Sequence, residues 1–302
     1  MSIVIEKYKN QTGIYVLRDD LLPGGTKSIL IDSLLINHHD VNEFVYASPC
    51  YGGFQIALSI FCKNNNKKAT IFCAERKIRH PNTEICIQNG ANVVEVPYGY
   101  LSVVEKHARE YVSIKSMCQA TNDAEGGVLG ELPLVPLKIA FGANSPESIN
   151  IIASRAKRVI ESFTEIYGKP PDEIWCAVGS GTLISGIIQA VAEMQGAQCL
   201  TPNCQALPTW EMGHMGDAPC SKGSEGAACP LKIYGVQVGK EFNGSQFPNV
   251  TILVYPKPFE YASKLKIDFP SMPNYDLKAF ELCLEYNKNS HDNKKVLFWN
   301  VL

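Results

Sequence analysis

Short apolar runs alternate with segments of helical periodicity along most of this chain. Three runs have the composition of buried strands: "EFVYAS" (43–48), "KATIFCA" (68–74) and "ANVVEVP" (91–97). Each is followed by a segment with apolar residues spaced three and four apart, at 54–65, 80–90 and 100–116. Repeated strand–helix units of this kind predict an α/β fold with a parallel sheet covered by helices.

The same alternation resumes after a polar, glycine-rich stretch at 119–131, which reads as a loop. Predicted helices cover 146–167, 182–195 and 275–288, and predicted strands cover 172–178, 232–239, 250–256 and 295–302. We therefore expect two lobes: a large domain from residues 1–41 and 117–302, and a small α/β domain from residues 42–116.

Composition excludes several classes of protein. The chain has 302 residues, is 45% hydrophobic and carries a net charge of −2, so it lacks the broad positive charge expected for nucleic-acid binding. It contains neither a signal-peptide pattern nor an apolar run of about 18 residues, so no membrane segment is expected. The odd number of cysteines, 11, favours reduced thiols in the cytoplasm over a disulfide framework.

One irregular segment, 197–230, interrupts a connection between a helix and a strand that needs only a few residues. We interpret it as an insertion in the large domain, either a lid or a mobile loop. A zinc site is the alternative, because the segment carries five potential ligands: Cys199, Cys204, His214, Cys220 and Cys229. Their spacing matches no compact zinc motif, so free thiols are favoured and no metal is predicted.

Two short motifs carry the candidate chemistry. "LLPGGTKS" (21–28) places Lys27 after two glycines and directly before a helical pattern. "VGSGTLISG" (178–186) is a strand–turn–helix motif of small residues, and the free N–H groups at such a helix start suit a phosphate. On its own the second motif is weak, because tight turns often contain glycine for steric reasons alone.

Together these motifs resemble those of fold-type II pyridoxal-phosphate enzymes, the tryptophan synthase β-like superfamily. The likeness is greatest to the branch of 1-aminocyclopropane-1-carboxylate deaminase and D-cysteine desulfhydrase, including its short phage-type members. "LRDDLLPGGTKS" resembles the segment around the Schiff-base lysine, "VGSGTLISG" the phosphate cup, and "MPNYDLKAFELCLEY" the C-terminal block. The resemblance implies two parallel-sheet lobes with pyridoxal 5′-phosphate in the cleft between them.

The resemblance also implies roles for individual residues. Lys27 would bind the cofactor, Gly179, Ser180, Gly181 and Thr182 would hold its phosphate, and Asp276 would face its pyridine nitrogen. Tyr275 would stack near the ring or donate a proton. Cys50 and Tyr51 would be catalytic residues of the loop that holds the substrate carboxylate, with the Cys50 thiol as nucleophile or base. Each residue has an ordinary alternative: Asp276 as a helix cap, Tyr275 as an interface aromatic, Cys50 as a buried apolar residue, and Lys27 as a solvated lysine.

This chain departs from the pattern in that loop. Tyr51 stands where the family has an asparagine, and Thr26 where it has another. We therefore expect a lyase, deaminase or transferase that acts on an amino acid or amino-acid-bearing molecule, with a homodimer as its assembly. The alternatives are a non-catalytic binding or structural module, favoured by the altered loop at 50–53, and a phosphate- or nucleotide-binding enzyme without pyridoxal.

Overall fold

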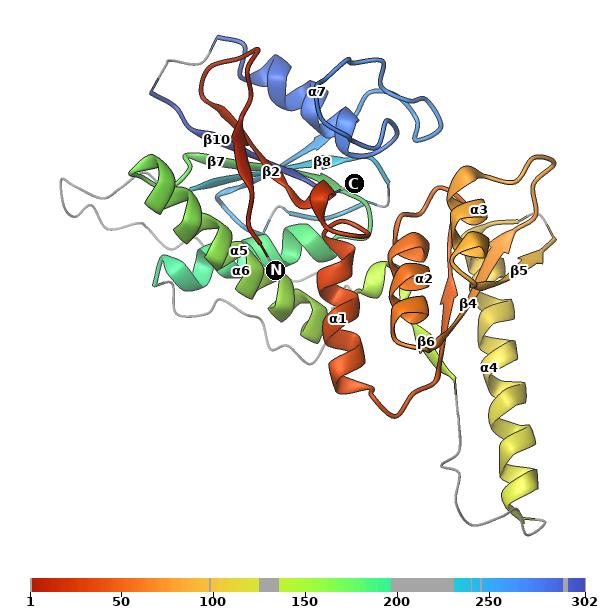
Figure 1. The fold of residues 1–302 in the computed structure, drawn as a ribbon. Helices are drawn as coiled ribbons and strands as arrows, with labels where there is room; N and C mark the ends of the chain where they lie inside the picture. Colours follow the sequence, from red (N-terminus) through yellow and green to blue (C-terminus); the bar gives the residue numbers. More distant parts are fainter. Residues whose placement is uncertain are drawn as a thin grey trace, which may run out of the picture.

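A computed structural model describes residues 2–97, 99–124, 136–196, 231–239, 241–244, 246–289 and 293–301. The chain forms two lobes, each built on its own sheet, with helices on the sheet faces (Figure 1). The predicted insertion 197–230, with its cysteines and His214, lies outside the described residues. Within the described part of the chain, no helix is both long and apolar enough to span a membrane.

The large lobe contains a six-stranded sheet in the order β1-β2-β10-β7-β8-β9. All neighbouring strands are parallel except the β1–β2 pair. The strands are β1 (Ile5–Lys7), β2 (Ile14–Arg18), β10 (Val296–Asn300), β7 (Glu173–Val178), β8 (Lys232–Gln237) and β9 (Val250–Val254). The sequence analysis did not anticipate β1 and β2, and β2 pairs with the C-terminal strand β10.

Alternating side chains on the central strand β7 enter two separate cores. Ile174, Cys176 and Val178 pack with α5 (Pro146–Tyr167) and α6 (Thr182–Met194) on one face. Trp175 and Ala177 pack on the other face, with α7 (Asp276–Tyr286). A parallel strand with helices on both faces is expected to be apolar throughout, and every residue of β7 is buried.

The small lobe contains a four-stranded parallel sheet in the order β5-β4-β3-β6. The strands are β5 (Asn92–Val96), β4 (Lys68–Ala74), β3 (Glu43–Ala47) and β6 (Leu137–Ile139), and the helices are α2 (Phe54–Asn64), α3 (Pro81–Gln88) and α4 (Leu101–Ala124). The lobe thus extends past residue 116, the predicted boundary. Part of the predicted loop 119–131 is helical, and β6 pairs with β3 although the chain between them is long.

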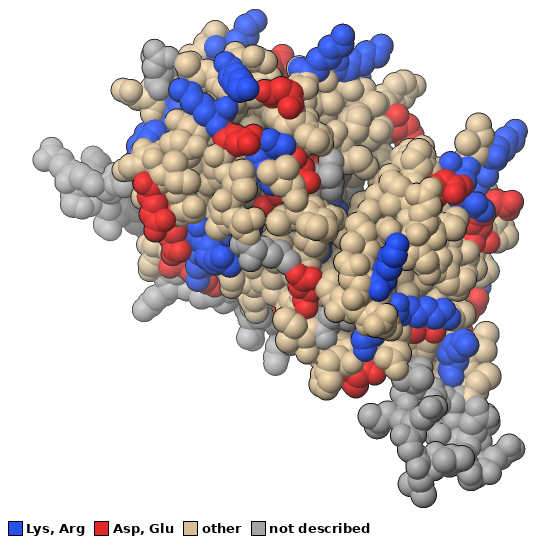
Figure 2. Space-filling model, viewed as in Figure 1, with Lys and Arg blue, Asp and Glu red and all other residues tan. Residues whose placement is uncertain are grey.

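Helix α1 (Lys27–Asn37) lies between the lobes (Figure 1). Its buried Leu30 and Ile31 belong to a core that also contains Phe54 and Ala57 of α2 and Ile152 of α5. The helix that begins with Lys27 is therefore packed on both sides. Over the molecular face in Figure 2, lysines and arginines are interspersed with aspartates and glutamates, as expected for a nearly neutral chain.

Candidate functional site

Lys27 is the first residue of α1 and follows a turn that requires glycine. Gly24 and Gly25 have φ of +89° and +69°, in the left-handed region that side chains disfavour. A Cβ on Gly24 would lie 2.6 Å from the Cβ of Ala57 on α2. The two glycines therefore let the chain reverse direction in contact with the small lobe, and they deliver Lys27 to the junction between the lobes.

A buried polar network fixes the segment before Lys27. The carboxylate of Asp19 accepts hydrogen bonds from Arg155 (2.6 Å), Thr26 Oγ1 (2.9 Å) and Trp299 Nε1 (3.0 Å). The backbone N–H of Thr26 donates to the carbonyl of Val301 at 3.2 Å. Thr26, which replaces the family's asparagine, is thus an anchor that joins this segment to β10. Sequence reasoning did not identify this role, because its partners lie far away along the chain.

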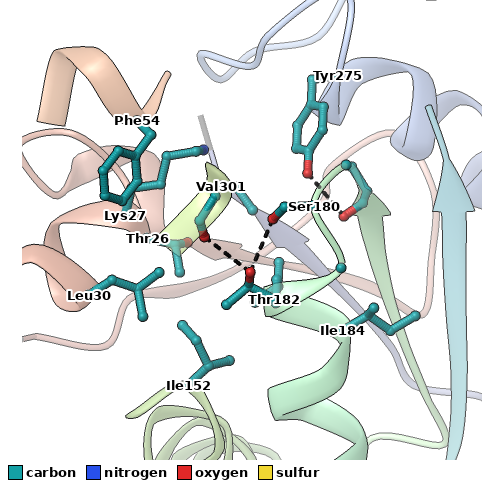
Figure 3. A pocket seen from close by; sticks show the side chains of 15 residues that line it. Thr26, Lys27, Leu30, Phe54, Ile152, Ser180, Thr182, Ile184, Tyr275 and Val301 are labelled. Atoms are coloured by element: carbon teal, nitrogen blue, oxygen red, sulfur yellow. Dashed lines mark hydrogen bonds between the residues drawn. The ribbon is translucent and has the colours of Figure 1, made fainter. Parts of the chain in front are cut away.

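Lys27 lines a cavity together with the predicted phosphate cup. The lining residues are Thr26, Lys27, Leu30, Phe54, Gly142, Ile152, Ala177, Gly179, Ser180, Gly181, Thr182, Leu183, Ile184, Tyr275 and Val301. Figure 3 shows Lys27 and Phe54 on one side, with Tyr275, Ser180 and Thr182 across from them. The Lys27 amine lies 5.7 Å from the centroid of the Tyr275 ring. Five of the predicted cofactor residues and Tyr275 therefore share one cavity.

Burial changes the acid–base properties of the groups in and beside this cavity. Desolvation lowers the pKa of Lys27, and the negative charge of Asp276 opposes that effect. Asp276 is fully buried at the start of α7. Burial, followed by the Asp276 charge, raises the pKa values of Tyr275 and Cys176. An amine with a lowered pKa is partly neutral and can act as a nucleophile, whereas the Tyr275 phenol keeps its proton.

The turn from β7 into α6 has the form of an anion-binding site. Gly181 is the residue before the helix, with φ of +87°. The first backbone bond of the helix joins Ser185 N–H to the Gly181 carbonyl, so the N–H groups of the three preceding residues face the turn. A Cβ on Gly179 would lie 2.8 Å from the Tyr275 ring, so glycine permits this close packing.

Two hydroxyl groups in this turn are bonded to each other and to the connection between the lobes. Thr182 Oγ1 donates to the carbonyl of Gly142 at 3.0 Å, and it lies 3.1 Å from Ser180 Oγ (Figure 3). Since a threonine hydroxyl has one hydrogen, Ser180 supplies the hydrogen of the second bond. Gly142 has φ of +65°, and a Cβ there would lie 2.2 Å from the Cβ of Ser180. Sequence reasoning did not identify Gly142, which stands in "AFGANS".

Cys50 and Tyr51 are not among the residues that line the cavity. Cys50 is buried, and burial, followed by the charge of Glu95, raises the pKa of the nearby Cys73 to about 11. The ring of Tyr51 contacts His80, with centroids 4.7 Å apart, and Phe259, 5.8 Å away. The catalytic roles of Cys50 and Tyr51 remain predictions. Phe54, which is the first residue of α2 and follows Tyr51 by three residues, does line the cavity.

No protein-family model matches this sequence, and no curated protein matches it. Solved structures do match. An ACC deaminase homologue has a TM-score of 0.68 and 14% identity, with 100% of this chain and 89% of that chain covered. O-ureido-L-serine synthase has a TM-score of 0.64 and 10% identity, with 99% and 88% covered. A hydrogen sulfide-producing enzyme from Fusobacterium nucleatum has a TM-score of 0.61 and 14% identity, with 99% and 92% covered.

These matches extend over both lobes, so they concern the arrangement of the whole chain and not one common subdomain. The two parallel sheets, the lysine at the start of the helix between the lobes, and the glycine turn before α6 are the features that the sequence motifs predicted. The chain has the two-lobed α/β fold of fold-type II pyridoxal-phosphate enzymes.

Proposed function

We propose that this protein is a pyridoxal-phosphate-dependent enzyme that acts on an amino acid or amino-acid-bearing molecule. One observation carries the proposal: Lys27, the turn Gly179–Thr182 and Tyr275 line the same cavity, although they are distant in sequence. The fold shared with an ACC deaminase homologue and with O-ureido-L-serine synthase supports it. Among the reactions open to such an enzyme, we propose a lyase, deaminase or transferase reaction.

The residues fit this cofactor in three respects. The turn before α6 offers the backbone N–H groups at a helix start, the donors that suit a phosphate dianion. The lysine has a lowered pKa, as covalent attachment of an aldehyde requires. Asp276 supplies a buried negative charge close enough to alter the pKa of Lys27. A buried carboxylate suits the protonated nitrogen of a pyridine ring.

When bound, pyridoxal phosphate supplies an electron sink that stabilises negative charge at the α-carbon of an amino acid. The chain's own residues would do the rest. The turn Gly179–Thr182 would hold the phosphate, and the Asp276 carboxylate would keep the ring nitrogen protonated. Lys27, as a neutral amine, would take the proton from the α-carbon and return it. The Tyr275 phenol, which stays protonated, could donate a hydrogen bond near the same place.

The experiment asks whether Lys27 carries the cofactor. The protein is mixed with pyridoxal phosphate, freed of excess and reduced with borohydride, and the labelled peptide is then identified. We expect visible absorption before reduction and a label on Lys27. Lys27→Ala should lose both, whereas Lys7→Ala, which removes an exposed lysine, should keep both. A label on another lysine, or absence of any label, would overturn the assignment.

A non-catalytic binding module is the second candidate, because the loop at 50–53 departs from the family pattern. The two candidates differ in one measurement, the exchange of the α-proton of alanine or serine in D₂O. An enzyme of the proposed class should exchange this proton faster than Lys27→Ala does under the same conditions. A protein that binds the cofactor and absorbs visible light, but exchanges the α-proton of no amino acid in a broad panel, would be a non-catalytic binding module.

A further inference from the structure

An aromatic contact joins the two lobes. Tyr51 belongs to the loop between β3 and α2 of the small lobe, and Phe259 to the segment between β9 and α7 of the large lobe. Their ring centroids lie 5.8 Å apart, with an angle of 72° between the planes. This edge-to-face geometry is typical of direct aromatic contact, so no other group lies between the rings. Both residues are half-buried, which places the contact near the surface and outside the cores.

The Tyr51 side of this contact is held within the small lobe. The ring of His80 packs against Tyr51, with centroids 4.7 Å apart and an angle of 68°. The side chain of Asn82 donates to the Tyr51 carbonyl at 3.1 Å. The Asn82 backbone N–H in turn donates to His80 Nδ1 at 3.2 Å. Tyr51 is therefore positioned by the start of α3, through both its ring and its backbone.

The Phe259 side is held within the large lobe. The carbonyl of Phe259 accepts hydrogen bonds from Asn274 Nδ2 at 2.8 Å and from Lys278 Nζ at 3.2 Å. Lys278 is fully buried, and its amine also donates to the Pro258 carbonyl at 2.8 Å. The same amine lies 5.6 Å from the centroid of the Phe259 ring. A buried lysine bonded to two carbonyls fixes this surface segment to α7.

Both sides of the contact connect directly to the Lys27 cavity. On the small lobe, Phe54 lines the cavity three residues after Tyr51. On the large lobe, Tyr275 lines it and directly follows Asn274, which binds the Phe259 carbonyl. The contact is thus joined to the cavity lining on both sides, through the chain from Tyr51 to Phe54 and through the hydrogen bond from Asn274 to Phe259.

We propose that Tyr51 and Phe259 form a gate that limits the size of the substrate side chain. This inference rests on the proposed function, because it concerns an amino acid bound near Lys27. A short side chain leaves the contact between the rings intact, whereas a long or branched one forces them apart and loses their packing. Tyr51, which stands in the loop that departs from the family pattern, is then a specificity-determining residue.

The first measurement tests the contact without any cofactor. Hydrogen–deuterium exchange is followed in peptides that cover 255–265, in the wild type and in Tyr51→Ala. If the contact holds the large-lobe segment, Tyr51→Ala should exchange faster there, and Tyr51→Phe, which keeps the ring, should match the wild type. Equal exchange in Tyr51→Ala and the wild type would mean that the contact is absent in solution and would overturn the gate.

The second measurement tests specificity by the change in cofactor absorption when an amino acid binds. In the wild type, we expect alanine or serine, in the better-bound enantiomer, to bind at least about tenfold more tightly than leucine or phenylalanine. Tyr51→Ala and Phe259→Ala should each reduce this ratio to within about threefold. Tyr51→Phe and Tyr261→Phe, an exposed aromatic of the same segment, serve as controls that keep the wild-type ratio.

Two negative results have different meanings. If the wild type takes up no cofactor, the proposed function is wrong, and the proposed limit on the size of the substrate side chain is then wrong as well. If the cofactor binds but the wild type binds leucine as tightly as alanine, or both alanine variants keep the wild-type ratio, the gate alone is wrong. Agreement between Tyr51→Ala and Phe259→Ala matters, because the two residues come from different lobes and contact each other.

Discussion

At the scale of single residues, the amine of Lys27 is subject to two opposing influences. Burial disfavours its charged form and lowers its pKa, while the Asp276 carboxylate favours that form. Burial is the larger influence, so the charged amine is destabilised in the folded protein. Lys278 is also buried, but its amine is bonded to two backbone carbonyls. Lys27 bears the cost of burial while lining a cavity, which is the reason to regard it as functional.

We expect Lys27→Met to be more stable than the wild type, because it removes the burial of a charge. The pKa of Lys27 is lowered from an ordinary value of 10.5, so the cost is greatest at pH values below the folded-state pKa. The advantage of Lys27→Met should therefore shrink as the pH rises and vanish above about 10.5. Urea unfolding from pH 6 to 10 measures this. An advantage that is absent, or that grows with pH, would contradict the prediction.

Asp276→Asn should lower the pKa of Lys27 further, because it removes the charge that opposes burial. The measurement is the pH dependence of reductive methylation at Lys27 in protein free of cofactor, read by mass spectrometry. We expect the midpoint to move to lower pH in Asp276→Asn and to stay unchanged in Asp268→Asn, an exposed carboxylate on the preceding segment. An unchanged midpoint in Asp276→Asn would show that the Asp276 carboxylate does not affect the pKa of Lys27.

At the scale of elements, one buried ion pair holds together the segments that position α1. Asp19 and Arg155 have side-chain exposures of 1% and 3%, and their closest atoms are 2.6 Å apart. Asp19 precedes α1, Arg155 belongs to α5, and Trp299 of β10 donates to the same carboxylate. A buried pair of this kind contributes little net stability compared with apolar residues, but loss of one partner leaves a buried charge.

We expect Arg155→Met and Asp19→Asn each to lower the free energy of unfolding by about 3–5 kcal/mol. The double variant should cost less than the sum of the two, because it leaves neither charge alone. Urea unfolding of all four proteins gives the coupling energy. Strictly additive effects would show that the two groups do not stabilise each other. The Asp19–Arg155 pair would then not be the interaction that positions α1.

Glycine is required at the start of α6 for two separate reasons. Gly181 and Gly168 have φ of +87° and +79°, but only at Gly181 would a Cβ meet a neighbour, Phe242, at 2.9 Å. Gly168→Ala should cost about 1–2 kcal/mol from backbone strain alone, and Gly181→Ala should cost more. Thermal unfolding compares the two. Equal losses would mean that Phe242 moves aside freely. The missing Cβ of Gly181 thus faces Phe242.

The sequence predicted those elements that have strong local patterns. The predicted helix 146–167 has the observed bounds, because Ser145 caps its start and Gly168 ends it in the left-handed region. Strands β1 and β6, with 3 residues each, are too short to show a period. At the site, the glycine motifs located Lys27 and the turn at 179–182. Phe259 could not be predicted, since its contact with Tyr51 depends on how the lobes pack, and the contact of His80 with Tyr51 depends on how α3 packs beside the loop before α2.

At the scale of the whole molecule, the two lobes are joined by a chain of hydrogen bonds that reaches the candidate phosphate site. Tyr46 of β3 accepts a hydrogen bond from Gly142 N–H at 3.2 Å, and the Gly142 carbonyl accepts one from Thr182 at 3.0 Å. Gly142 and Ala143, the connection from β6 to α5, have φ of +65° and +50°. The strained connection is thus held between the small lobe and the turn before α6.

This arrangement predicts that Thr182 supports the connection between the lobes as well as the phosphate turn. Thr182→Val keeps the shape of the side chain but removes the donor to the Gly142 carbonyl. It should lower the free energy of unfolding by about 1 kcal/mol and speed hydrogen exchange in 140–145. Thr182→Ser keeps the hydroxyl and should retain the slow exchange. Because both measurements use protein without cofactor, they separate this structural role from phosphate binding. If Thr182→Val left exchange at 140–145 unchanged, the connection would be held by Tyr46 and local packing, and cofactor binding at the turn would have no direct route to the small lobe.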